Sequence, residues 1–515
     1  MKISSENILF YGIVGSYSQR ISTWPLIEAL SDKGHNVTYI SAYDSKDPHP
    51  KIYDYAPKKW KETMGPWEGY KTFYEVRKNK QMLNMWFELP SLGLLACESL
   101  YSDPEFMKWV KSSSFDLIVV DGLMNECAYG LVQLYKSKLI IYGSSSVMGW
   151  YYAYGLPDET ASVTECMFNF PPGKEMSFLQ RFVNGMSPLV WQVLREYWYF
   201  PKLEEVTKKA LDLDVLPPFS EIERGANLLM LTSHYSLDYA RSLPPHVVNV
   251  GGMTSLRKAE PVSKKLEDFI NKGKNGFIYV SFGTVAEFVN FDKHVQEEFI
   301  KAIQSFPNMQ FIWKSTYDVN ATLPSHVMVT NWAPQLSLLA HPKIKAFITH
   351  SGMGSTVEAI HFEVPLISFP VLAEQDFNAN TVASRNAGIK LEILTLKQEE
   401  LEHAISEILE NPKYRNAMKK LSKISKDRPT SALENAVWWT EYILRHPDSN
   451  EYLHPPSIQQ SWWVKRQIDV WFFAAMLVIL LPSLLIYGLF RLCRKLVYSI
   501  VSISRKNTNY RKKTQ

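Results

Sequence analysis

The stretch from Trp332 to Gln375 reads WAPQLSLLAHPKIKAFITHSGMGSTVEAIHFEVPLISFPVLAEQ. Its apolar run at 345–349 predicts a buried strand that ends at His350, and a Gly-x-Gly turn then opens a helix. The backbone N–H groups and the positive dipole end at the start of a helix attract anions, and glycines allow the backbone to come close. This order of strand, imidazole, glycine-rich turn and helix predicts a diphosphate site.

Residues on either side of that turn suit the rest of a nucleotide. Trp332 offers a flat face for a base, and Glu358, one turn into the predicted helix, can reach a ribose. A lone Gly-x-Gly turn would be weak, because such turns are common in ordinary loops. The fixed order of Trp, Gln, His, Gly, Glu, Pro, Pro and Gln is far more specific, and it indicates a nucleotide-sugar pocket.

The joint pattern resembles the signature of the UDP-glycosyltransferases, the family of animal UDP-glucuronosyltransferases and UDP-glucosyltransferases. The resemblance implies that uracil stacks on Trp332 and that Gln335 and Glu358 hold the ribose. It also implies that the imidazole and the glycine-rich turn contact the diphosphate, together with a strand-to-loop element at 280–284, and that an acidic residue and a Gln bind sugar hydroxyls. The implied donor-binding residues are Ser281, Gly283, Thr284, Trp332, Gln335, His350, Gly352, Gly354, Ser355, Glu358, Glu374 and Gln375.

Two positions depart from the family pattern. Glu374 stands where relatives usually carry the shorter Asp, and Gly354 stands where many carry Asn. Both changes bear on which sugar is bound, that of UDP-glucose or that of UDP-glucuronate. They bear less on donor binding itself. The UDP-sugar is a co-substrate, and we expect no cofactor and no metal.

Transfer with inversion requires a general base, because an acceptor hydroxyl is largely protonated at neutral pH. The resemblance implies a His in the loop after the first strand, oriented by an Asp at the end of a later strand. Asp121 matches that Asp, but Gln19 occupies the position of the His in the loop at 15–21. A Gln amide takes up no proton near neutral pH, and loss of a base costs about 10² to 10⁴ in rate.

Three other ionisable residues bear on the missing base. Asp121 could act directly if burial raised its pKa, and His49 stays a candidate in an undefined loop. His35 follows the Gly that ends a predicted helix, so we expect it to be structural. Phenolic or carboxylic acceptors, already acidic, would suffer least from the absence of a base.

Short, dense apolar runs predict the strands of two α/β halves. These runs are 8–14, 36–41, 115–121 and 139–142 in the first half, and 276–282, 310–313 and 345–349 in the second. Predicted helices lie at 23–33, with Pro25 in the first turn, and at 292–305 and 397–410.

The βαβ opening of the chain favours a doubly wound sheet. The resemblance implies the GT-B fold: an α/β architecture in which two Rossmann-like domains face a cleft. The acceptor-binding domain is then 1–245 and the UDP-sugar-binding domain 246–445. The stretch from 151 to 216, rich in aromatics, Pro and Met, either helps to wall the acceptor pocket or belongs to the ordinary core.

The C-terminal part predicts a membrane anchor. The uncharged stretch 470–490 is long enough to span a bilayer of roughly 30 Å, and the juxtamembrane segment 446–469 precedes it. The tail 491–515 carries basic but no acidic residues, so the positive-inside rule places it in the cytosol and the body in the lumen. Lys512 and Lys513 match a dilysine retrieval signal, and we expect a single-pass protein of the endoplasmic reticulum membrane.

No signal peptide precedes the first predicted strand, and we expect the natural start to lie upstream.

The 515 residues are 21% charged and 46% hydrophobic, with a net charge of +4, as in a globular chain with one apolar segment. No basic stripe with interleaved aromatics appears in the body, so we expect no nucleic-acid partner.

The cysteines and one acidic pair give no metal signal. The four cysteines show no CxxC or CxxH spacing, and they indicate neither zinc nor a disulfide framework. Asp212-Leu-Asp214 superficially matches the metal-binding DxD of another glycosyltransferase fold, but it precedes two prolines at a loop. We expect a solvated turn there.

Two functional hypotheses follow from the sequence. In the first, the chain is a membrane-bound enzyme that moves a hexosyl or glucuronosyl group from a UDP-sugar to a small lipophilic acceptor with inversion. In the second, it is a catalytically impaired or silent relative that binds UDP-sugar or lipophilic ligands, or partners active relatives. A homo- or hetero-oligomer is compatible with either.

Overall fold

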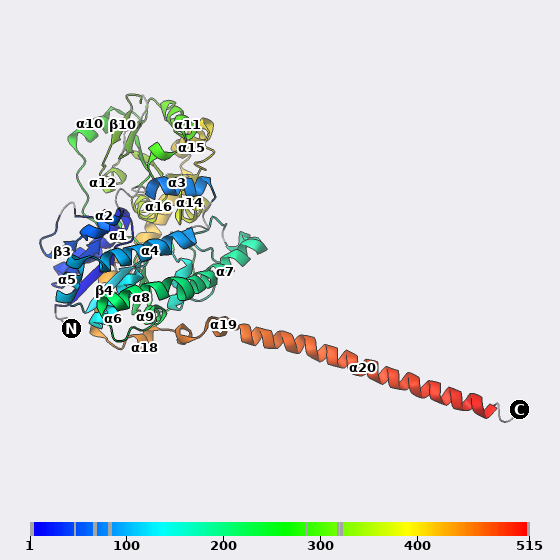
Figure 1. Cartoon of the computed structure of the whole chain (residues 1–515). Helices are drawn as coiled ribbons and strands as arrows, with labels where there is room; N and C mark the ends of the chain where they lie inside the picture. Colours follow the sequence, from blue (N-terminus) through cyan, green and yellow to red (C-terminus); the bar gives the residue numbers. More distant parts are fainter. Residues whose placement is uncertain are drawn as a thin grey trace. The chain divides into compact units, whose positions relative to one another are not determined.

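The computed structural model describes residues 5–45, 48–64, 69–80, 85–171, 173–283, 286–316, 319 and 323–511. The chain divides into a compact body, Met1–Ile458, and a C-terminal unit, Gln459–Gln515. The body contains two parallel sheets (Figure 1), so the expected architecture of two α/β halves is confirmed.

The first sheet has seven strands in the order β3-β2-β1-β4-β5-β6-β7. They are β1 (Asn7–Gly12), β2 (Asn36–Ser41), β3 (Ile52–Tyr55), β4 (Leu117–Asp121), β5 (Lys138–Gly143), β6 (Leu228–Leu231) and β7 (Val247–Asn249). All of the pairings are parallel. The strand order reverses between β1 and β4, which makes their carboxyl ends the switch point of this sheet.

The second sheet has six strands in the order β10-β9-β8-β11-β12-β13. They are β8 (Phe277–Ser281), β9 (Gln310–Lys314), β10 (Val327–Thr330), β11 (Ile344–Thr349), β12 (Leu366–Ser368) and β13 (Gly388–Lys390). These pairings are parallel as well, and the order reverses between β8 and β11. In open α/β sheets ligands bind outside the carboxyl ends of the strands at such points.

Helices connect the strands and cover the sheets. Those before the second sheet are α1 (Tyr17–Asp32), α2 (Lys58–Met64), α3 (Gly69–Lys78), α4 (Met85–Tyr101), α5 (Pro104–Ser112), α6 (Tyr129–Tyr135), α7 (Phe178–Leu194), α8 (Phe200–Leu211), α9 (Phe219–Arg224) and α10 (Lys264–Lys272). Those that follow are α11 (Lys293–Gln304), α12 (Gln335–Leu339), α13 (Met353–His361), α14 (Gln375–Ser384), α15 (Gln398–Glu410), α16 (Lys413–Lys426), α17 (Ala432–Arg445), α18 (Asn450–Leu453), α19 (Trp462–Lys465) and α20 (Ile468–Arg511).

The first helix begins earlier than the sequence predicts. A loop was expected up to about Thr23, but α1 starts at Tyr17 and Pro25 lies inside it. The Gln19 side chain accepts a hydrogen bond from the backbone N–H of Ser16 at 2.6 Å, which stabilises the helix start. Gln19 therefore projects from a rigid first turn and not from a loop.

Two segments cross between the halves. Helix α17 packs against α1 and β5 of the first sheet, although it follows the second sheet in sequence. Helix α3 precedes β4 yet packs against the second half, where Tyr74 stacks on Phe291 and Arg77 pairs with Asp376 (Figure 1). These crossings fasten the two halves to each other.

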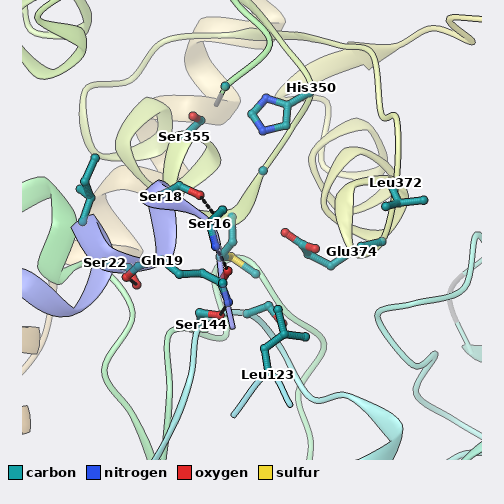
Figure 2. Close-up of a pocket in the computed structure, with 18 of the residues that line it drawn as sticks. Ser16, Ser18, Gln19, Ser22, Leu123, Ser144, His350, Ser355, Leu372 and Glu374 are labelled. Carbon is teal, nitrogen blue, oxygen red and sulfur yellow. Dashed lines mark hydrogen bonds between the residues drawn. The ribbon is translucent and has the colours of Figure 1, made fainter. Parts of the chain in front are cut away.

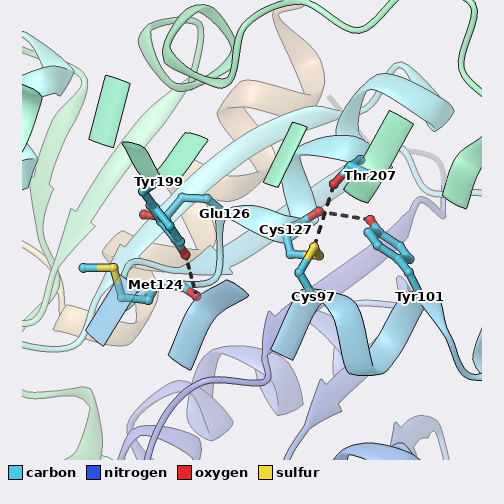
Figure 3. The surroundings of a disulfide bond; sticks show 7 residues. All are labelled: Cys97, Tyr101, Met124, Glu126, Cys127, Tyr199 and Thr207. Carbon is cyan, nitrogen blue, oxygen red and sulfur yellow. Dashed lines mark hydrogen bonds between the residues drawn. A yellow bond between two sulfur atoms is a disulfide. The ribbon is translucent and has the colours of Figure 1, made fainter. Parts of the chain in front are cut away.

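A disulfide joins Cys97 of α4 to Cys127, in the short helical turn that follows β4 (Figure 3). The sequence showed no disulfide framework, because the two cysteines lie 30 residues apart without a diagnostic spacing. Cys166 and Cys493 are free. The bridge fixes α4 against the switch-point edge of the first sheet.

The C-terminal unit contains the longest helix. An 18-residue window within Ile468–Ser504 of α20 has a mean hydropathy of 2.4, and this part of the helix is long and apolar enough to cross a membrane. The helix runs on through the basic stretch to Arg511. The Lys512-Lys513 pair of the retrieval signal lies outside the described residues.

Candidate functional site

One cavity of about 1040 Å³ lies between the carboxyl edges of the two sheets. Its lining residues include Gln19, which follows β1, and Leu123, which follows β4. They also include Gly283, which follows β8, and His350, which follows β11. Both switch points therefore face the same space. This is the arrangement in which two Rossmann-like halves share a ligand.

The imidazole ring of His350 packs closely against two glycines, Gly283 and Gly352. A Cβ at Gly283, where φ is +81°, would lie 2.5 Å from the ring, and a Cβ at Gly352 would lie 2.6 Å from Nε2. Burial, helped by the charge of Lys314, lowers the pKa of His350 to about 4. The imidazole is therefore neutral at pH 7, and it lies beside the start of α13, which begins with Met353 (Figure 2).

Glu358, in the middle of α13, is a buried carboxylate. Glu358 accepts from Arg257 Nη2 at 2.7 Å and from Gln335 Nε2 at 2.7 Å. Gln335 also reaches Ser355 Oγ at 3.2 Å. This network presents amide, hydroxyl and carboxylate groups to the cavity, which are the groups that bind ribose hydroxyls.

Trp332 stands at the end of the same wall. Its side chain is 40% exposed, and its Nε1 donates to Glu260 Oε2 at 3.0 Å. An exposed indole whose orientation is fixed by a hydrogen bond leaves its ring face for a base.

Two charged residues of this wall, Lys314 and Arg257, were not predicted from the sequence. Lys314 ends β9 beside β8, and its Nζ donates to the carbonyl oxygen of Gly283 at 2.8 Å. Its position at the carboxyl end of a predicted strand next to β8 could have drawn attention to it. Arg257 lies in the junction between the sheets, where no periodicity or motif marks it.

Glu374 and Gln375 line the cavity at the start of α14. Gln375 Oε1 accepts from the backbone N–H groups of Val371 and Leu372 at 2.8 and 3.0 Å, which leaves its amide nitrogen for a ligand. Figure 2 shows Glu374 below His350 with its carboxylate turned toward the side of the pocket where Ser16 lies, and burial raises its pKa. None of the ion pairs among the described residues involves Glu374.

All but one of the remaining predicted donor-binding residues also line the cavity. Ser281 and Gly354 line it, and a Cβ added at Gly354 would meet nothing within 4 Å. The Asn that many relatives carry would therefore have room. Thr284 lies outside the described residues.

Gln19 separates the cavity from Asp121. Its Nε2 donates to Asp121 Oδ1 at 3.3 Å and to Ser144 Oγ at 3.0 Å (Figure 2). Burial raises the pKa of Asp121 to about 7, although the backbone N–H of Leu123 also donates to it. Gln19 lines the cavity whereas Asp121 does not, so the carboxylate lies behind the amide.

The other end of the cavity is apolar. Its wall combines aromatic, Met and Leu side chains: Trp60, Met64, Phe73, Met85, Phe87, Leu89, Leu92, Leu95, Leu123, Met148, Trp150, Met167 and Leu372. Most come from α2, α3 and α4, and only Met167 comes from 151–216, so that stretch contributes little to this apolar wall. Such a wall suits irregular lipophilic molecules.

Two other sequence candidates lie outside the cavity. His35 is buried, accepts from the backbone N–H of Glu6 and lies 3.8 Å from Glu441 Oε1, which is a structural role. Asp212 and Asp214 are exposed at the end of α8. Within the part of the chain that the structure describes, no cluster of three or more His, Cys, Asp or Glu side chains is placed to hold a metal ion.

Comparison with known proteins matches this geometry to a family. The family model described as UDP-glucoronosyl and UDP-glucosyl transferase matches residues 14–507. UDP-glucosyltransferase 2 of Dactylopius coccus is 27% identical, with 86% of this chain and 85% of the relative covered. UDP-glucuronosyltransferase 1A6 of Homo sapiens is 26% identical, with 88% and 85% covered.

A third relative and a solved structure extend the comparison. The 2-hydroxyacylsphingosine 1-beta-galactosyltransferase of Homo sapiens is 29% identical, with 78% of this chain and 72% of the relative covered. The structure of the spinosyn forosaminyltransferase SpnP aligns with a TM-score of 0.58 at 14% identity. It covers 86% of this chain and all of that one, which supports the GT-B fold.

Proposed function

Because the chain belongs to the UDP-glucuronosyl and UDP-glucosyl transferase family, we propose that it moves a hexosyl or glucuronosyl group from a UDP-sugar to a small lipophilic acceptor. The observation that carries the proposal is the cavity itself. One end presents His350, Lys314 and the start of α13, and the other end is apolar. An anionic nucleotide and a lipophilic acceptor therefore fit side by side.

The donor end suits each part of a UDP-sugar. Uracil stacks on Trp332, and the ribose hydroxyls bind to Glu358 and Gln335. The diphosphate lies at His350 and at the backbone N–H groups that open α13. Glu374 and Gln375 hold hydroxyls of the sugar.

Transfer follows from this placement. The acceptor oxygen releases its proton to solvent and attacks the anomeric carbon. The bond from that carbon to the diphosphate oxygen breaks, its electron pair leaves with UDP, and the configuration inverts. Negative charge grows on the leaving UDP, and Lys314 and the N–H of neutral His350 stabilise it. Because these groups are already oriented, they cost little reorganisation in the transition state.

The acceptor side restricts the chemistry. Gln19 takes up no proton, and the Asp121 carboxylate lies behind it. We therefore expect acceptors whose hydroxyl is already acidic, such as phenols and carboxylic acids, to react faster than aliphatic alcohols. An acylsphingosine in the name of one human relative supports a lipid-like acceptor.

A second candidate rests on Gln19. A chain that keeps its donor end but lacks an accessible base could bind UDP-sugar or a lipophilic ligand without transfer. It could also act by partnering active relatives. The donor residues favour the enzyme, because they surround the space that a sugar must occupy.

The location and orientation of the chain in the membrane are also part of the proposal. Helix α20 would anchor the chain in the endoplasmic reticulum membrane in a single pass, with the body in the lumen and the basic tail in the cytosol. The Cys97–Cys127 disulfide supports a luminal body, because disulfides persist in oxidising compartments.

The experiment is transfer by membranes that contain the full chain. Labelled UDP-glucose and UDP-glucuronate are offered with matched phenols and aliphatic alcohols, and the His350→Ala variant serves as the blank. Glycoside formation above the blank, greater for phenols, is the expected result. UDP binding without transfer from either donor would favour the second candidate.

A further inference from the structure

The turn 372–376, which leads into α14, contains a strained residue. Ala373 has a φ of +54°, in the left-handed region that residues other than glycine rarely adopt. Such a residue persists only where its surroundings fix it, and such residues cluster at ligand sites. Glu374 and Gln375 follow directly, and all three residues line the cavity. The side chains that hold this turn therefore decide where Glu374 and Gln375 point.

Apolar residues of the first half hold the beginning of the turn. Leu372 forms a buried cluster with Val76 of α3 and Met85 of α4, and Ala373 packs against this cluster. Helices α3 and α4 both precede β4 in the chain. The conformation of the turn therefore depends on elements that lie outside the second half.

Arg77 of α3 holds the end of the turn. Its Nη1 donates to Asp376 Oδ2 at 2.7 Å, and its Nε and Nη2 donate to the two oxygens of Glu392 at 3.0 and 2.6 Å. The side chains of Arg77 and Asp376 are only 12% and 9% exposed, so water and salt screen this ion pair little. Asp376 directly follows Gln375 in α14. The forked guanidinium thus fixes the residue next to the two that face the cavity.

A second cation reaches Asp376 from within the second half. Lys390, at the end of β13, has its Nζ 2.7 Å from Asp376 Oδ1. Burial alone would raise the pKa of Asp376, but hydrogen bonds and charge from Arg77 and Lys390 hold it below its ordinary value. Asp376 is therefore ionised at pH 7. Lys390 ties α14 to its own sheet, whereas Arg77 ties it to the first half.

The same part of the first half borders the acceptor end of the cavity. Phe73 of α3 and Leu89 of α4 pack against the cluster that holds Leu372. Both of these residues, and Met85 as well, line the cavity. Helix α3 therefore connects the apolar wall with the turn that carries Glu374 and Gln375.

We propose that Arg77 is a positioning residue for the donor sugar. Its ion pair with Asp376 completes the contacts that hold the turn 372–376, so that Glu374 and Gln375 face the sugar. Arg77 does not line the cavity, so it acts through the turn and not by touching the donor. The holding of the turn stands on the contacts alone, whereas the effect on the sugar rests on the proposed function.

The holding of the turn is tested by hydrogen exchange in the full chain without any ligand. The backbone N–H groups of Val371 and Leu372 both donate to Gln375 Oε1, so their exchange rates report on the turn. We expect these rates to rise about tenfold in Arg77→Met, because the turn opens more often when its end is released.

Two features of the variants keep this test clear of general unfolding. Asp376 retains Lys390 in Arg77→Met, so we expect α14 to stay folded and the Tm to change little. Arg77→Lys keeps the charge but loses the forked geometry, so its exchange rates should fall between those of Arg77→Met and the wild type.

The matched control is Lys78→Met. Lys78 is the neighbour of Arg77 in α3, and it pairs with Asp292 at 2.7 Å, away from the turn. This variant loses one cation and one ion pair from the same helix, and it should leave the exchange of the turn unchanged. Exchange in Arg77→Met as slow as in the wild type, or equal acceleration in Lys78→Met, would overturn the holding of the turn.

Positioning of the sugar is tested by calorimetric titration with UDP and with UDP-glucose or UDP-glucuronate, whichever the wild type binds more tightly. We expect Arg77→Met to weaken the UDP-sugar about tenfold and to leave UDP unchanged, because misplaced groups no longer meet the sugar. Lys78→Met should change neither affinity. Equal losses of UDP and UDP-sugar in Arg77→Met, or no loss of either, would refute the positioning role.

Gln375→Ala distinguishes a failure of this inference from a failure of the proposed function. It removes a group of the turn itself, so it should also weaken the UDP-sugar and leave UDP unchanged. If Gln375→Ala has this effect and Arg77→Met does not, Arg77 has no positioning role and the proposed function stands. If neither variant affects the UDP-sugar, the turn does not face the sugar, and the sugar placement in the proposed function is wrong as well.

Discussion

Gln19 and Asp121 form a hydrogen bond of 3.3 Å in which the amide donates to the carboxylate. The other end of the same amide accepts from the backbone N–H of Ser16, so the Gln19 side chain is fixed at both ends. It lies between the cavity and a carboxylate whose pKa is about 7. An imidazole in this place would face the acceptor and be oriented by Asp121.

The first prediction concerns Gln19→His. The new imidazole can accept the acceptor proton, so we expect transfer to aliphatic alcohols to rise by about 10² to 10⁴, and transfer to phenols to rise less. The measurement is kcat/KM for a series of acceptors of graded acidity. A matched double variant that adds Asp121→Asn should lose most of the gain. If Gln19→His leaves the rates of all acceptors unchanged, the assignment of position 19 is wrong.

The second prediction concerns the burial of Asp121. Its folded pKa is raised from 3.8 to about 7, so the folded state prefers the protonated acid. The group costs no stability below pH 3.8, and it costs progressively more as pH rises towards 7, where the cost levels off. At about 1.4 kcal/mol per pKa unit, the cost is on the order of 4 kcal/mol.

Asp121→Asn resembles the protonated acid and removes that cost. We therefore expect the variant to gain thermal stability over the wild type at pH 7.5, and to lose most of this advantage as pH falls towards 4. Thermal unfolding of the full chain in detergent, followed across this range, is the measurement. A stability difference that does not vary with pH would mean that Asp121 titrates normally.

The third prediction separates the diphosphate from the nucleoside. Lys314→Met removes a positive charge beside His350, so UDP affinity should fall about 10- to 100-fold while uridine affinity stays unchanged. Glu358→Gln should instead weaken UDP and uridine alike, because the ribose is common to both. Calorimetric titrations measure both variants, with Glu410→Gln on exposed α15 as the control. Equal losses of UDP and uridine in Lys314→Met would contradict the placement of the diphosphate.

The fourth prediction concerns the bridge between Cys97 and Cys127. Closing a loop of 30 residues stabilises a fold by about 3 to 4 kcal/mol in the chain-entropy account. Replacing both cysteines by Ser should lower the Tm, and it should raise the KM for acceptors because α4 carries part of the cavity wall. Cys493→Ser, which leaves the bridge intact, is the control. An unchanged Tm would show that the bridge contributes nothing to the folded state.

Much of the donor end could be predicted from sequence because its residues follow one another closely. His350, Gly352 and Glu358 occupy one strand end and the helix after it, so the chain order already fixes their neighbourhood. Parallel strands buried on both faces are also dense apolar runs, which made β1, β4, β8 and β11 recognisable.

Contacts between distant segments could not be predicted in this way. Arg257 meets Glu358 across 101 residues and Arg77 meets Asp376 across 299, and no local pattern encodes either pair. The disulfide was missed for the same reason. The start of α1 was missed because the Gln19 side chain stabilises it by accepting a hydrogen bond from the backbone N–H of Ser16, which hydrophobic periodicity does not register.

The configuration of the product tests the central claim most directly. The full chain is given a UDP-sugar with the α configuration and a phenol, and the anomeric proton of the purified glycoside is examined by NMR. In-line attack in one cavity predicts a β-glycoside from the wild type and no product from His350→Ala. An α-glycoside, or a glycoside formed equally well by His350→Ala, would contradict direct transfer at this site.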